Sequence, residues 1–270
     1  MAVAIALDKR MAVGTISDRR EPMEILITNA RGTAAAPHWS EQLAAASAAA
    51  LVAGGARVRW LWPHAGGRQR PELAGVELLA VAGAVPPFRR VQAQIEDAAA
   101  DLLLTQTLRT RPADLVHHMG FGGPGSVNSL WIADRMGSHA SAAVRAAEVL
   151  CHRQTLIDER GRACRAFEDA ARCRDCCTTA GTGSLTDGQA WLARWLRPLG
   201  ALSPFPSRNQ FRNRLELAVG NLQLAVAVYV ASAADAELLA TAGIGRRSLQ
   251  VVPLDQTLAA ALRASAGVAT

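Results

Sequence analysis

The sequence contains no hydrophobic run long enough to cross a membrane. A spanning helix needs about 20 consecutive apolar residues, and the longest candidate, residues 217–230, is broken by a glycine, an asparagine and a glutamine. The apolar opening, residues 1–7, stops at Asp8 and lacks the basic leader of a signal peptide. We therefore expect a cytoplasmic protein.

Lysine is also nearly absent. Lys9 is the only one among the 29 basic residues, and the formal net charge is +6. The arginines are spread along the chain rather than gathered in one block, which disfavours a dedicated nucleic-acid surface. The positive charge favours phosphate-bearing substrates and a peripheral contact with anionic lipid at the inner face of the membrane.

The common nucleotide-binding signatures are missing as well: there is no Walker loop, no GxGxxG after a strand, and no internal repeat. Strand-like and helix-like segments alternate instead, which predicts βαβ units and an α/β, Rossmann-like parallel sheet with helices on both faces. Strands are expected at 24–28, 57–62, 76–81, 114–118, 140–144, 225–230 and 249–253, and helices at 41–53, 88–108, 126–136, 189–196 and 208–224 and after Ser232.

Ligands of such a sheet bind at the carboxyl ends of its strands. The loops at 29–39, 117–125 and 145–151 are therefore the places where a site is expected.

The order of these segments resembles the N-terminal, acceptor-side domain of family 4 glycosyltransferases, which have the GT-B fold. The resemblance rests on the strand at 23–29, the helix that ends at Gly54-Gly55, the strand that ends in His118, and residues 211–254. A cysteine-bearing branch of the family resembles residues 144–151, the turn from Asp158 to Cys164, and Cys173 to Cys176. The resemblance implies a single acceptor-binding domain over residues 23–255, with a cysteine-rich loop at 151–177.

Two pairs of positions depart from the family pattern. His38 and Trp39 stand where the family has a glycine pair, and Arg145 and Ala146 stand where it has its catalytic His and Asp. Arginine cannot act as a general base near neutral pH. Only residues 256–270, expected to be a tail, follow the point where the family enters its nucleotide-sugar domain, and residues 1–22 read as a flexible extension or a mis-called start.

Five cysteines lie between Cys151 and Cys177. In a reducing compartment this clustering disfavours a disulfide framework. The spacing Cys151-x12-Cys164-x8-Cys173-x2-Cys176 offers four thiolates for a structural zinc ion. An iron–sulfur cluster, a redox pair at Cys173 and Cys176, and unliganded thiols remain alternatives; Cys177 has no obvious role.

Five loop or strand-end residues are candidates for substrate binding. Arg31 and Arg145 can hold a phosphate in bidentate fashion, and His38 and Trp39 offer faces for stacking a sugar. His118 ends a strand at the ligand edge, where only one of the two neighbouring histidines can face a ligand. For each residue, packing or solvation is the alternative.

These features lead to competing functions. One is an acceptor-binding half-enzyme that acts with a separately encoded donor-sugar-binding domain. Another is a pseudo-glycosyltransferase that binds or regulates without transfer, for which Arg145 and Ala146 speak. A third is a zinc-binding interaction module with no role in glycosyl transfer. Trp191 and Trp195, one helical turn apart, could also form an apolar stripe for a homo-oligomer or another chain.

Overall fold

The computed structural model describes residues 22–30, 39–64, 71–82, 97–121, 128–179, 195, 208–255 and 258–265. In this part of the chain, parallel strands form one seven-stranded sheet in the order β3-β2-β1-β4-β5-β6-β7. The strands are β1 (Glu24–Asn29), β2 (Arg57–His64), β3 (Val76–Ala82), β4 (Leu115–Met119), β5 (His139–Ala143), β6 (Ala227–Val230) and β7 (Leu249–Val251). The predicted α/β, Rossmann-like class is confirmed.

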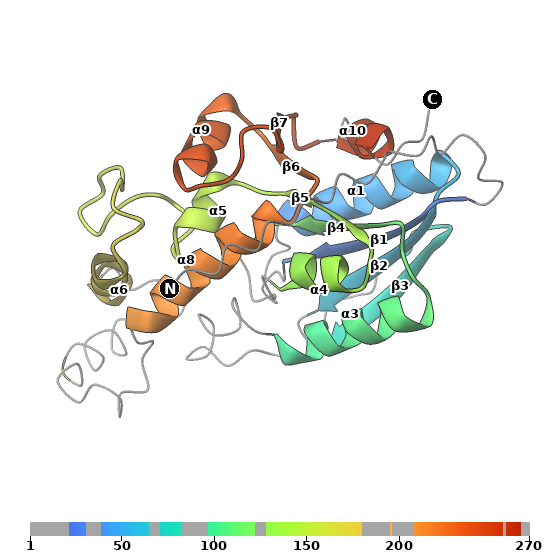
Figure 1. The fold of residues 1–270 in the computed structure, drawn as a ribbon, viewed down its shortest axis with the longest axis horizontal. Helices are drawn as coiled ribbons and strands as arrows, with labels where there is room; N and C mark the ends of the chain where they lie inside the picture. Colours follow the sequence, from blue (N-terminus) through green and yellow to red (C-terminus); the bar gives the residue numbers. More distant parts are fainter. Residues whose placement is uncertain are drawn as a thin grey trace, which may run out of the picture.

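Helices cover both faces of this sheet. Figure 1 shows α1 (Trp39–Ala53) and α10 (Leu258–Ser265) on one face, and α3 (Ala98–Thr110) and α4 (Ser129–Arg135) on the other. The remaining helices are α5 (Ala146–Leu150), α6 (Ala170–Thr179), α8 (Arg208–Gln223) and α9 (Ala233–Thr241). None of the helices in the described ranges is long and apolar enough to cross a bilayer.

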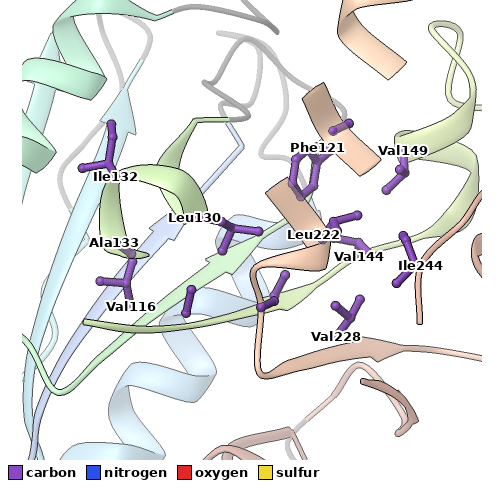
Figure 2. Packing of buried hydrophobic residues seen from close by; sticks show 14 of the residues in the cluster. Val116, Phe121, Leu130, Ile132, Ala133, Val144, Val149, Leu222, Val228 and Ile244 are labelled. Atoms are coloured by element: carbon purple, nitrogen blue, oxygen red, sulfur yellow. The ribbon is translucent and has the colours of Figure 1, made fainter. Parts of the chain in front are cut away.

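Strand β1 shows how the sequence builds the two cores. Leu26 packs into the cluster under α3, α4 and α8, while its neighbours Ile25 and Ile27 pack into the cluster under α1 and α10. All three are at most 1% exposed, as expected for a strand that lies between two helical layers. In the first core, Leu222 of α8 lies against Val144, which follows β5 (Figure 2).

Local signals set several helix ends. Ser232 caps α9 by accepting a hydrogen bond from the Asp235 amide at 3.1 Å, as the sequence predicted. Gly55 (φ +86°) ends the turn after α1 in the left-handed region that favours glycine. Asp97 caps α3 by accepting a hydrogen bond from the Ala100 amide at 3.2 Å. Residues 88–96 of the predicted 88–108 helix lie outside the described residues.

Two segments differ from the expected pattern. Part of the cysteine-rich segment, predicted as a loop, is the helix α6. The expected tail at 256–270 includes α10, whose Leu258 and Leu262 are fully buried in the second core. The predicted helix at 189–196 and Trp191 lie outside the described residues; Trp195 is 73% exposed.

Candidate functional site

The carboxyl ends of β1, β4 and β5 meet at one edge of the sheet. The register pairs Thr28 of β1 with His118 of β4, and His118 with Ala142 of β5. The residues that follow these strands therefore lie close together, as expected for the ligand edge of a parallel sheet. Of the predicted binding residues, Arg31 and His38 lie outside the described part of the chain.

Arg145 and Trp39 are stacked at this edge. Arg145 follows β5 and Val144 and caps α5 with an extended backbone, and its side chain is exposed. Its guanidinium carbon lies 4.5 Å from the centroid of the half-buried Trp39 ring at the start of α1. This is the geometry of a cation–π contact, and it leaves the cation open to solvent.

Glu148 fixes the Trp39 side of this stack through a hydrogen bond, and it was not among the residues predicted from the sequence. Its carboxylate is only 3% exposed and accepts hydrogen bonds from the Trp39 indole nitrogen and from the Phe121 amide, the latter at 3.3 Å. A buried carboxylate needs such donors to offset its lost hydration. Glu148 lies in the first turn of α5, three residues after Arg145, and no local sequence pattern sets it apart from an ordinary acidic residue at a helix start.

His118 lies beside this group but is enclosed. It is 3% exposed, and its Nδ1 lies 2.8 Å from the hydroxyl oxygens of both Thr28 and Ser129. Burial lowers the pKa of His118 to about 4, although a hydrogen bond with the Gly120 backbone and the charge of Glu148 act in the opposite direction. The imidazole is therefore neutral near pH 7.

His117 points to the opposite face, as strand alternation requires. Its Nδ1 lies 2.8 Å from the Ser141 hydroxyl, and its ring packs edge-on against Tyr229 at 5.9 Å. Burial, and then the neighbouring His118, lowers the pKa of His117 to about 3. Its position in the second core makes it a packing residue.

The structure thus brings together three of the predicted binding residues: Trp39, His118 and Arg145. Glu148 connects them, since it bonds Trp39 and acts electrostatically on His118. One face of Trp39 is already covered by Arg145. The group presented to a ligand is therefore the guanidinium rather than that face of the indole ring.

The cysteines form a second constellation, next to α5. One small cavity of about 20 Å³ is lined by all five of them, together with His152, Arg153 and a few neighbours. Cys151 follows α5, Cys164 follows a turn, and α6 carries Cys173, Cys176 and Cys177. Among the described residues, no group of three or more His, Cys, Asp or Glu side chains has an arrangement that could hold a metal ion as it stands.

Asp158 organises the turn that leads to Cys164. Its carboxylate accepts hydrogen bonds from the Arg160 amide at 3.0 Å and the Arg162 amide at 2.8 Å, and Gly161 takes the left-handed φ of +77°. The Cys164 amide then donates to the Leu156 carbonyl at 2.7 Å. The Asp-x-x-Gly-x-x-Cys pattern is thus a hydrogen-bonded turn that presents its cysteine.

Charged groups surround these thiols. Burial raises the pKa of the Cys173 thiol to about 12. The Arg153 Nη1 atom lies 3.6 Å from the Cys176 sulfur. The fully buried Arg214 of α8 donates to the carbonyls of Val149 at 2.8 Å and Glu148 at 2.5 Å, and burial lowers its pKa to about 10.

The sequence matches no protein-family model, and no curated protein matches it. Solved structures with a similar arrangement include HepE of Anabaena in complex with UDP and glucose (12% identity, TM-score 0.40, 86% of this chain and 44% of that chain). A UDP-glucosyltransferase from Polygonum tinctorium is also similar (12% identity, TM-score 0.42, 86% of this chain and 52% of that chain). So is MnaA of S. aureus with UDP (14% identity, TM-score 0.36, 85% of this chain and 43% of that chain).

The chain thus spans about half the length of these structures. At such identities and TM-scores, the fold assignment rests on the sheet order and the two helical layers of this chain. The family 4 resemblance, its cysteine-bearing branch and the domain limits stay predictions.

Proposed function

We propose that this chain is a glycosyltransferase-like acceptor-binding domain that holds an anionic group of its ligand through Arg145 and does not itself transfer a proton. The observation that carries the proposal is the stack at the sheet edge. Arg145 is exposed, its guanidinium covers Trp39, and Trp39 is fixed by the buried Glu148.

The side chains described at this edge suit binding better than acid–base chemistry. A guanidinium stays charged and offers a planar set of donors for phosphate or carboxylate. His118 is neutral and enclosed, and Glu148 is occupied by the Trp39 and Phe121 donors. The half-buried carboxylate of Asp235, next to Arg145, is engaged as well, since it accepts a hydrogen bond from the Ala146 amide at 3.2 Å.

Glycosyl transfer would require a donor-sugar-binding domain in addition to this one. The sequence resemblance assigns the present chain the acceptor side, so a separate donor-binding partner fits this proposal. In its absence the chain acts as a binding or regulatory domain.

The test uses inorganic pyrophosphate as a minimal anionic probe, titrated into the purified chain by calorimetry. Arg145→Ala should weaken binding by roughly 1–3 kcal/mol, the range for losing a charge-assisted contact. Arg145→Lys should restore it only in part, because an ammonium lacks the planar fork. The melting temperature should change little, since the side chain is exposed.

Arg135→Ala is the matched control. Arg135 also stacks on a tryptophan, with its guanidinium carbon 5.4 Å from the Trp131 centroid, but it ends α4 ahead of β5, at the opposite edge of the sheet. This variant should bind pyrophosphate like the parent. Equal losses in the Arg135 and Arg145 variants would mean that net charge, not the proposed site, governs binding.

A further inference from the structure

Three separate segments bring their cysteines to one cavity. Cys151 comes from the end of α5, Cys164 from the turn fixed by Asp158, and the remaining three from one face of α6. On α6, Cys173 precedes Cys176 and Cys177 by three and four residues, the spacings that place side chains on the same helix face. The thiols are therefore gathered by tertiary structure, beyond their closeness in sequence.

Cys173 lines the cavity together with Cys151, Cys164 and Cys176, and its sulfur lies 3.7 Å from the Phe167 carbonyl oxygen. These are the four cysteines whose sequence spacing matches a four-thiolate site. The cavity they line, about 20 Å³, has room for a single ion or water molecule.

The surrounding charges suit thiolates bound to a divalent ion. A zinc ion with four thiolates carries two net negative charges, which would be costly to bury alone. Arg153 lines the cavity with its Nη1 atom 3.6 Å from the Cys176 sulfur and offsets part of that charge. The carboxylates of Asp158 and Glu159 line the cavity as well. Arg172, another lining residue, is paired with Asp158 at 3.5 Å.

From this arrangement we propose that the cavity binds one zinc ion through the thiolates of Cys151, Cys164, Cys173 and Cys176, with Cys177 and His152 outside the ligand set. Binding requires the four sulfur atoms to turn toward a common point. Each cysteine side chain turns about one bond between staggered positions. Zinc with four thiolates is a closed, structural type of site.

The experiment starts with the whole chain, purified without oxygen or added metal and analysed for elements. We expect about one zinc per chain, which a strong chelator removes, with an increase in hydrogen exchange across residues 151–177. Cobalt(II) added to the stripped protein should give the charge-transfer bands of a four-thiolate tetrahedral site.

Single substitutions then assign the ligands. Cys164→Ser and Cys173→Ser should each reduce zinc affinity at least tenfold and weaken the thiolate-to-cobalt bands, while Cys177→Ser and His152→Ala should leave both unchanged. Because Cys173→Ser could also impair folding, the chelation and cobalt measurements on the unmodified chain test the site on their own.

Several results would overturn the proposal. They are a metal-free chain in which all five thiols react freely, a disulfide between any two of the cysteines, iron with inorganic sulfide in place of zinc, or loss of zinc in His152→Ala. None of these depends on whether Arg145 binds an anion.

Discussion

His118 illustrates how the sheet edge controls protonation. Its Nδ1 atom lies 2.8 Å from the hydroxyl oxygens of Thr28 and Ser129, and the ring is also hydrogen-bonded to the Gly120 backbone. Burial disfavours the charged form of the ring. The unfolded chain, by contrast, exposes the ring at its ordinary pKa of about 6.5. Between pH 6.5 and about pH 4, the His118 ring is therefore protonated in the unfolded state and neutral in the folded state.

This difference predicts a pH dependence of stability. As pH falls from about 6.5 toward 4, the free energy of unfolding should decrease, with a His118 contribution on the order of 3 kcal/mol at the lower end. His118→Asn, which has no titrating group at this position, should remove the His118 share of this slope. The buried His117 and His152, whose pKa values burial also lowers, should keep contributing to it. Denaturant titrations at several pH values would measure it.

His139 provides the control, because it is an exposed histidine at the start of β5. His139→Asn should keep the slope of the parent protein. If the His118 variant kept the same pH dependence of the free energy of unfolding, the pKa of His118 would not be lowered in the folded state.

At the same scale, the sequence indicated some of the site residues and missed another. Arg145 and His118 could be proposed because each stands at or just after a strand end, a position that period and topology reveal. Glu148 could not, since its role depends on a hydrogen bond to Trp39, 109 residues away. An acidic residue in the first turn of a helix is by itself ordinary.

Among the elements, those buried on both faces were the most predictable. Strands β1 and β2 combine β-branched or bulky apolar residues with clear glycine or polar breaks, so their positions followed from the sequence. Helix α6 was not foreseen because cysteine, arginine and aspartate give it no apolar stripe of the usual kind. Its cysteines line one cavity with Cys151 and Cys164, a tertiary arrangement that the local sequence does not indicate.

Helix α10 was also missed, although it belongs to the second core. Leu262 is fully buried there, and the Tyr229 hydroxyl of β6 donates to the Ala261 carbonyl at 3.4 Å. Leu262→Ala should lower the free energy of unfolding by about 2–5 kcal/mol, through lost burial and the cavity left behind. Chemical denaturation would detect this loss as a lower midpoint.

Leu102→Ala in α3 is the comparison, because Leu102 is 58% exposed. Its effect should stay within about 0.5 kcal/mol. If Leu262→Ala lowered the free energy of unfolding no more than Leu102→Ala does, α10 would contribute little to the stability of the domain. Residues 256–270 would then behave as the tail that the sequence predicted.

Across the whole molecule, the architecture was predictable and the function was not. Alternating segments imply parallel strands and two helical layers, which the sheet order confirms. The direction of the strands also fixed the edge at which to search. The site at that edge is formed by side chains from α1, β4 and α5. Their contacts join segments far apart in the sequence, so no local sequence pattern predicts them.

The shortness of α5 has a thermodynamic consequence. Arg145 caps one end of this helix and Cys151 caps the other, with five residues, about one and a half turns, between them. Arg214 donates hydrogen bonds to the carbonyls of Glu148 and Val149 within the helix. If both proposed sites bind their ligands, zinc bound at the Cys151 end of α5 should also change the affinity for pyrophosphate at the Arg145 end. Equilibrium linkage then demands reciprocity: the factor by which zinc alters pyrophosphate affinity must equal the factor by which pyrophosphate alters zinc affinity.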